Sequence, residues 1–298
     1  MLRITCCICY SDCYMSESIT VSTWNLQGAL SNPEHTDYVA NAIKNQGGSI
    51  LTLPDAWRVD SEKSERTGRS PQLKDTDFKA LGYTYYGTTF PDDRPDDNYA
   101  HYGFASLVHE SLPVIDFNEI KLGERRAHHL RVDLAGIALN VISLYLDDRG
   151  EDIRMRQLDD LSPVLSNHHN EPIVLMGDFN AMHRSSLAAR LLRSPGVNKV
   201  AQRIPFKNGA ASNLVGMGKG DTMARLAGNG FHDADPEHQA TMPSSLPLFQ
   251  LDHIMFRHGL NKRLSVEKPV RTLHAGISDH VQLSTTVAIA DSHEHSHH

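Results

Sequence analysis

The sequence from Ile173 to Met182 reads IVLMGDFNAM and places a carboxylate and an amide directly after an apolar run. That run is long enough for a strand buried on both faces. Gly177 permits a sharp turn, so Asp178 and Asn180 stand at the end of a rigid element. Side chains of these types can bind hard cations and phosphate oxygens. They are also common turn formers, and this stretch alone leaves both interpretations open.

Polar residues recur at the ends of four other predicted strands. They are Asn25, Asp55, Asp252, and the pair Asp279 and His280. Each has a structural explanation when taken singly, because Asn and Asp form turns and helix caps and because a histidine can simply lie on the surface. Five such strand ends in one chain are harder to explain in this way, since polar groups near a core are costly unless they have partners or a use.

The order of these residues resembles the endonuclease/exonuclease/phosphatase superfamily, which includes exonuclease III, pancreatic-type deoxyribonuclease, inositol polyphosphate 5-phosphatases and neutral sphingomyelinases. The resemblance rests on GDFN, LDHI and SDH in this order and runs from about Ile19 to Ile289. It implies an α+β fold, a four-layer α/β/β/α sandwich of the deoxyribonuclease I-like type. It also implies a divalent-metal-dependent phosphoesterase that hydrolyses a phosphodiester or a phosphomonoester by direct attack of water.

The resemblance implies a metal site and a phosphate site. Asn25, Asp55 and Asp279 would hold Mg²⁺ or Mn²⁺, because carboxylate and amide oxygens suit these hard cations. Asn25 and Asn180 would donate hydrogen bonds to the phosphate oxygens. The substrate would be a phosphorylated compound, either nucleic acid or a small molecule.

The resemblance also implies how water attacks. Asp178 would orient or deprotonate the attacking water. Asp252 would fix the tautomer and direction of His280, which would donate to the phosphate and stabilise the transition state. No covalent enzyme intermediate is required.

Two positions depart from the family pattern. Pro54 and Asp55 stand where the family usually has Gln-Glu, so the metal ligand is one methylene shorter. Tyr145 lies in a strand where many phosphatase branches have Thr-His-Leu, whereas the exonuclease III branch has a tyrosine in a comparable strand. Tyr145 is therefore either a catalytic-site residue that contacts phosphate through its hydroxyl or a packing residue at the edge of the sandwich.

Further candidates for substrate binding lie outside these motifs. Arg126, beside Arg125, can reach a phosphate or can be a solvated surface residue. His101 and Tyr102 lie near the position where family members have substrate-facing residues. The basic, Gly-rich stretch 203–219 is either a recognition loop or a surface insertion.

The predicted elements place the motifs at strand ends. Strands are predicted at 19–24, 49–53, 83–86, 104–108, 130–134, 138–146, 173–176, 251–256 and 281–289, and helices between Asn32 and Gly47 and at 152–169, 187–192 and 221–227. In the second helix Ile153, Leu158, Leu161 and Leu165 are predicted to face inward. The stretch 58–79 is predicted as a surface loop that leads into a short helix, and 91–98 as an acidic loop.

Length alone allows one large domain or two small ones, but many strands with few helices, without an internal repeat or a long linker, predict one α+β domain at residues 18–290. The chain has 298 residues, of which 40% are hydrophobic, enough for a large core. All four cysteines, Cys6, Cys7, Cys9 and Cys13, lie near the start. We predict a disordered leader at 1–17, with metal binding as the alternative although the cysteine spacing fits no zinc pattern well, and a disordered His-rich tail at 291–298.

The net charge of −7 argues against generic nucleic-acid binding, although a local basic groove is compatible with it. With no signal peptide or apolar span recognised, we expect a monomer in the cytoplasm without constitutive membrane association. The alternative function is a catalytically weakened phosphate-binding module of the same fold, because Asp55 and Tyr145 depart from the family pattern.

Overall fold

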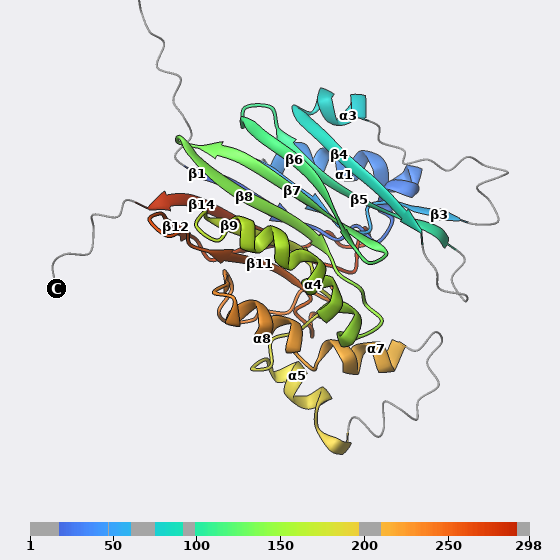
Figure 1. Ribbon diagram of the computed structural model, residues 1–298. Coiled ribbons are helices and arrows are strands. Elements are labelled where there is room, and N and C mark those ends of the chain that lie inside the picture. The colour runs from blue at the N-terminus through green and yellow to red at the C-terminus, as the bar shows by residue number, and fades with distance from the viewer. Residues whose placement is uncertain (1–17, 47, 61–74, 92–98, 197–209, 291–298) are drawn as a thin grey trace, which may run out of the picture.

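The computed structural model describes residues 18–46, 48–60, 75–91, 99–196 and 210–290 (Figure 1). The predicted leader at 1–17, the predicted tail at 291–298 and nearly all of the acidic loop at 91–98 lie outside these residues. No helix in the described ranges is both long and apolar enough to cross a membrane.

The first sheet, sheet A, contains the N-terminal and C-terminal strands. Its strands run in the order β12-β14-β1-β2-β5-β3, with β13 paired to β14 and β4 paired to β5. β1 and β2 are parallel, while β14 runs antiparallel to β1 as its alternating sequence predicts. The strands are β1 (Ser18–Thr23), β2 (Ile50–Leu53), β3 (Arg58–Asp60), β4 (Tyr83–Pro91), β5 (Tyr99–His109), β12 (Arg263–Val266), β13 (Val270–Thr272) and β14 (Gln282–Ala290).

The second sheet, sheet B, has the order β10-β11-β9-β8-β7-β6. β9 lies in its interior and is buried along its whole length, as the apolar run predicts. β8 and β9 are parallel, and β11 pairs antiparallel with β9. The strands are β6 (Val114–Leu122), β7 (Arg125–Leu134), β8 (Ile137–Tyr145), β9 (Ile173–Asp178), β10 (His232–Asp233) and β11 (Asp252–Arg257).

The two sheets pack face to face with helices outside them, which confirms the predicted four-layer sandwich (Figure 1). Ile19, Val141 and Met176 belong to the core between the sheets. The helices around sheet A are η1 (Ala29–Ser31), α1 (Pro33–Gln46) and α3 (Asp75–Ala80), and those on the side of sheet B are α4 (Glu151–Asn167), α5 (Leu187–Leu192), α7 (Ala210–Met217) and α8 (Asp221–Gly228).

Several elements differ from the prediction. β3 and α7 occupy stretches predicted as loops, and β6, β10, β12 and β13 were not predicted. β6 is an edge strand that leaves most of its side chains partly or fully exposed, so it lacks apolar alternation. Within α4, Ile153 is only half-buried, whereas Arg154 is completely buried and donates to Glu151 and to the carbonyl of Asp147. Buried hydrogen bonds of this kind have no signature in hydrophobic periodicity.

Candidate active site

The topology brings the polar strand ends together at one end of the sandwich. In sheet B the register pairs Asp178, at the end of β9, with both Tyr145 of β8 and Asp252 of β11. In sheet A the parallel strands β1 and β2 end side by side, so Asn25 and Asp55 follow them at the same edge. Antiparallel β14 begins where β1 ends, which places the preceding Asp279 and His280 there too.

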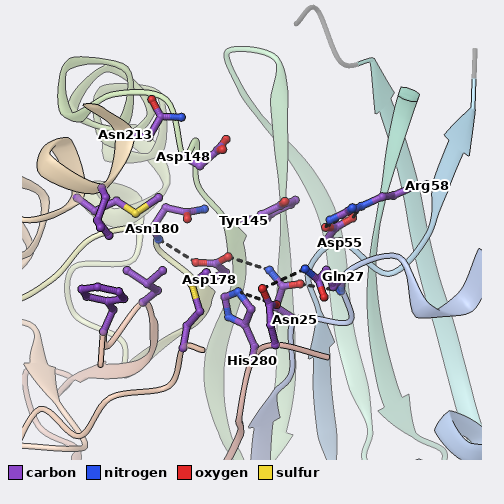
Figure 2. A pocket seen from close by; sticks show the side chains of 16 residues that line it. Asn25, Gln27, Asp55, Arg58, Tyr145, Asp148, Asp178, Asn180, Asn213 and His280 are labelled. Atoms are coloured by element: carbon purple, nitrogen blue, oxygen red, sulfur yellow. Dashed lines mark hydrogen bonds and ion pairs between the residues drawn. The ribbon is translucent and has the colours of Figure 1, made fainter. Parts of the chain in front are cut away.

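All of these residues except Asp252 line one pocket of about 380 Å³ between the ends of the two sheets (Figure 2). One wall is polar and the other is apolar. The lining residues are Asn25, Gln27, Asp55, Arg58, Tyr145, Asp148, Asp178, Asn180, Asn213, Leu214, Met217, Met242, Phe249, Leu251, Asp279 and His280.

Asp178 is a buried carboxylate with two hydrogen-bond donors. Its Oδ2 accepts from Asn25 Nδ2 at 2.8 Å, and its Oδ1 accepts from the backbone N–H of Asn180 at 2.9 Å (Figure 2). Burial, together with the like charge of Asp252, raises the pKa of Asp178 to about 7. A carboxylate with such a pKa can accept a proton from water near neutral pH.

The backbone before Asp178 depends on a glycine. Gly177 has φ +146°, and a Cβ there would lie 1.9 Å from the carbonyl oxygen of Leu144 on the neighbouring strand. This close approach of β8 and β9 fixes the position at which the following carboxylate leaves the strand.

His280 and Asp252 form a buried pair beside Asp178. The distance from His280 Nδ1 to Asp252 Oδ2 is 2.7 Å, and ligand atoms of Asp178, Asp252 and His280 all lie within 4.8 Å of one another. Burial lowers the pKa of His280, but the Asp252 carboxylate outweighs it and raises the pKa to about 10. The imidazole is therefore cationic at neutral pH and can donate through Nε2.

The two asparagines each keep one amide hydrogen that no protein acceptor uses in the described structure. Asn25 Nδ2 donates one hydrogen to Asp178, and Asn180 Nδ2 donates one to the carbonyl of Leu146 at 2.9 Å. An amide nitrogen carries two hydrogens, so a second bond to a phosphate oxygen remains open to both. Asn180 holds this direction with a left-handed backbone, φ +48°.

The residues expected to bind a divalent cation are all oxygen donors, as Mg²⁺ requires. Asp279 Oδ2 accepts from Gln27 Nε2 at 3.0 Å, while its Oδ1 is buried and has no hydrogen-bond partner within the described part of the chain. Asn25 Oδ1 accepts from the backbone N–H of Gln27 at 2.9 Å and keeps a second lone pair. Asp279 Oδ1, which lies 3.7 Å from His280 Nε2 without a hydrogen bond, and Asn25 Oδ1 are oxygen donors of the type that a divalent cation takes, and both residues contact Gln27.

Asp55 differs, because Arg58 already binds it. The Arg58 guanidinium donates to both carboxylate oxygens, and the pair lies on the opposite side of the pocket from Asn180 (Figure 2). Burial favours the neutral form of Arg58, but Asp55 outweighs it and raises the pKa of the guanidinium. Asp55 thus offers the pocket a carboxylate whose charge is already compensated.

Tyr145 lines the pocket under an arginine. The guanidinium of Arg125 lies over its ring, 4.4 Å from the centroid, and also over the ring of Phe90 at 5.1 Å. Burial raises the pKa of Tyr145, so its hydroxyl stays protonated and able to donate. This placement is compatible with phosphate contact and with packing.

Two predicted substrate contacts lie away from the pocket. Arg126 pairs with Glu119 on β6, whereas its neighbour Arg125 pairs with Asp147 and Asp148 and lies over the Tyr145 ring. His101 is exposed on β5 and is not among the lining residues. The structure therefore corrects the expectation that these two side chains join the others.

Sequence reasoning missed several lining residues. Gln27 lies in the NLQG turn just after Asn25, so its proximity to that residue was a usable signal. Arg58 stands three residues after Asp55, a spacing that suggests a pair, but the polar stretch around it indicated a loop. The apolar wall had no signal, because it depends on how α7 and the chain before β11 pack; it consists of Leu214, Met217, Met242, Phe249 and Leu251.

Comparisons with known proteins identify the family and the fold. The model of the Endonuclease/Exonuclease/phosphatase family matches residues 22–280, so the chain belongs to that family. No curated protein sequence matches the chain.

Solved structures show the same fold at low sequence identity. An endonuclease/exonuclease/phosphatase from Beutenbergia cavernae is 17% identical, with a TM-score of 0.59 over 92% of this chain and 72% of its own. ANGEL2, described as a 2',3'-cyclic phosphatase, is 14% identical, with a TM-score of 0.57 over 91% and 95%. Truncated Caenorhabditis elegans TDP2 is 15% identical, with a TM-score of 0.54 over 92% and 99%.

Proposed function

We propose that this protein is a divalent-metal-dependent phosphoesterase that hydrolyses a phosphodiester or phosphomonoester by direct attack of water. The observation that carries the proposal is that one pocket contains both a group that can accept a proton and a group that can donate one. Asp178 has a pKa near 7 and can take a proton, while His280, held by Asp252, is cationic and can donate. A base and a donor with separated pKa values are what hydrolysis of a phosphoester needs.

In this proposal the side chains of the pocket divide the work. Asp178 orients the water and accepts its proton as the oxygen attacks phosphorus. His280 Nε2 donates to a phosphate oxygen and stabilises the charge that builds up on it, with its ring direction set by the 2.7 Å contact to Asp252. The remaining amide hydrogens of Asn25 and Asn180 bind other phosphate oxygens.

Asn25 and Asp279 are the residues that would hold the cation, with Asp55 as a weaker third ligand. When bound, Mg²⁺ or Mn²⁺ would neutralise charge on the phosphoryl group and on the leaving oxygen. The Oδ1 of Asp279, which is buried and accepts no hydrogen bond within the described residues, supports this assignment. The Arg58 contact with Asp55 supports weakened metal affinity, because a guanidinium competes with the cation for the same carboxylate.

The two walls of the pocket suggest the kind of substrate. Phosphate would lie against the polar wall, and Met217, Phe249 and Leu251 would contact the organic part. A nucleoside or another small organic group with a phosphate fits this division. Because the structurally similar ANGEL2 is described as a 2',3'-cyclic phosphatase, we include a cyclic nucleotide among the substrates to be tested.

The test is hydrolysis of a substrate panel with Mg²⁺, with Mn²⁺ and with EDTA. The panel holds bis-p-nitrophenyl phosphate, p-nitrophenyl phosphate, adenosine 2',3'-cyclic phosphate and an abasic-site oligonucleotide, and Asp178→Asn is the control. Metal-dependent turnover that Asp178→Asn loses is the expected result, and the preferred substrate separates diesterase from monoesterase. Metal-independent turnover would contradict the cofactor assignment.

A second candidate is a phosphate-binding module without turnover, and the compensated charge of Asp55 favours it. Its outcome is distinct: the folded protein would bind Mg²⁺ and a phosphorylated ligand, yet no member of the panel would be hydrolysed with either metal.

A further inference from the structure

A second cluster of metal-binding side chains lies on the other face of β11 from the pocket. Asp252 points between the sheets, and the next residue, His253, points to the opposite side, where it contacts the ring of Phe179. There it meets Asp233 of β10 and His183, which follows the GDFN turn. Ligand atoms of His183, Asp233 and His253 lie within 4.8 Å of one another.

From this arrangement we propose that His183 Nε2, Asp233 Oδ2 and His253 Nδ1 bind one transition-metal ion, of which Zn²⁺ is the representative. Two imidazole nitrogens and one carboxylate oxygen are ligands that Zn²⁺ takes at about 2.0–2.2 Å. A set dominated by nitrogen does not suit Mg²⁺, which prefers oxygen. The site is therefore chemically distinct from the cation site of the pocket.

The hydrogen-bond partners of His253 show which of its ring nitrogens carries a hydrogen. His253 Nε2 lies 2.9 Å from the carbonyl oxygen of Ala181, which can only accept, so Nε2 carries the hydrogen. In a neutral imidazole, Nδ1 then has a lone pair that faces Asp233 Oδ2 at 2.8 Å. Two acceptors at this distance repel unless a positive species lies between them. That species is either a second proton on His253 or a metal ion.

Two further features favour the metal ion. A ligating histidine typically donates its other N–H to a backbone carbonyl, which is the role Ala181 plays for His253. Gln250 is only 3% exposed, lies with its amide 3.4 Å from the same carboxylate oxygen, and leaves its own Oε1 without a partner among the described residues. Because the two ends of an amide can be exchanged, this oxygen can face the ion as a fourth ligand.

A metal ion can reach this site from solvent past His183. His253 is fully buried, but the side chain of His183 is 16% exposed and stacks on the ring of half-buried His238, 4.0 Å between centroids. The ion would tie the segment that follows the GDFN turn to β10 and β11. It would thereby brace the backbone that carries Asn180 from the side away from the substrate.

The test measures Zn²⁺ stoichiometry in the full chain. The background variant lacks the other side chains near the chain ends that can bind Zn²⁺ themselves. It carries the substitutions His293→Asn, His295→Asn, His297→Asn and His298→Asn, and each of the four cysteines is replaced by serine. Isothermal titration runs in excess Mg²⁺, which competes for the oxygen site of the pocket. In this background we compare His183→Ala with His232→Ala, an exposed histidine on the same strand as Asp233.

We expect one equivalent of Zn²⁺ and a higher melting temperature with Zn²⁺ in the background and in His232→Ala, and the loss of both in His183→Ala. Equal stoichiometry in the background and His183→Ala would overturn the proposal. An anomalous difference map at the zinc edge keeps the test open if His183→Ala folds poorly. A peak between His183, Asp233 and His253 supports the site, and its absence in Zn²⁺-soaked crystals means that a proton links His253 to Asp233.

Discussion

Replacing Asp252 with Asn removes the carboxylate that is hydrogen-bonded to His280 and leaves only the more distant Asp279, 3.7 Å from His280 Nε2, as an ion-pair partner among the described residues. Asp252 is fully buried, and its Oδ2 lies 2.7 Å from His280 Nδ1. Its other oxygen has no hydrogen-bond partner in the described structure. In Asp252→Asn the imidazole therefore stays buried without this counter-charge, and its direction is no longer enforced.

The magnitude follows from the pKa of His280, which the pair raises from 6.5 to about 10. Each pKa unit corresponds to about 1.4 kcal/mol, and breaking a buried ion pair on one side costs about 3–5 kcal/mol. Relief of the like charge on Asp178 offsets part of this, so we expect a loss of about 3 kcal/mol in the free energy of unfolding. We also expect turnover to fall by about 10²–10⁴-fold.

The pH dependence of this loss has a defined sign. A raised histidine pKa stabilises the folded state fully below the unfolded value of 6.5, and this contribution disappears as the pH rises through about 10. The difference in stability between wild type and Asp252→Asn should therefore be largest near pH 6 and should shrink toward pH 10.

The assay is urea unfolding followed by circular dichroism at several pH values, with turnover measured on the same preparations. Asp152→Asn is the matched control, since Asp152 is exposed and pairs only across the surface of α4 with Arg156; it should change stability by less than about 0.5 kcal/mol. If Asp252→Asn matched this control in stability at pH 6 and kept wild-type turnover, the reasoning about the buried pair would be refuted.

Three other substitutions test separate parts of the structure. Asp55→Glu should keep or improve Mg²⁺-dependent turnover, because the longer side chain can reach past the arginine; complete inactivity in the nitrophenyl assay would contradict the role of Asp55. Gly177→Ala should fold poorly or lose more than about 4 kcal/mol in urea unfolding, since its Cβ would meet a carbonyl oxygen at 1.9 Å, whereas Gly123→Ala, with nothing within 4 Å, should lose about 1 kcal/mol. Burial lowers the pKa of His128 to about 3, so below pH 6.5 the unfolded chain binds a proton that the folded chain does not. The free energy of unfolding should therefore fall by about 1.4 kcal/mol per pH unit from pH 6.5 downward, and His128→Asn should remove this dependence. If the dependence of stability on pH is unchanged in His128→Asn, another group is responsible.

The polar strand ends were predictable because strand periodicity and family motifs both point to them. The buried run before Asp178 and the alternating C-terminal strand predicted their elements, which the structure contains as β9 and β14. Parallel pairing of β1 with β2 and of β8 with β9 then brings the residues after those strands together. The order of the motifs along the chain was thus enough to predict most of the polar wall.

The sequence did not predict which face of a strand some side chains occupy, nor the contacts between segments that are distant along the chain. Arg125 rather than Arg126 contacts Tyr145 of the pocket, although alternation along β7 puts Arg126 on the same face as His128, which bonds to Ser106 of sheet A. His253 follows Asp252 in the same motif, yet it points to the opposite side of the sheet. The Arg58 pair depends on β3, a three-residue strand in a stretch too polar to suggest one.

The most direct test of the central claim is turnover of bis-p-nitrophenyl phosphate by wild type, Asp178→Asn and His280→Ala at saturating Mg²⁺, with EDTA as the metal control. We predict turnover by the wild type only, its loss in EDTA, and unchanged circular dichroism spectra for both variants. Wild-type turnover in either folded variant would mean that the base and the donor of the reaction are not these two residues.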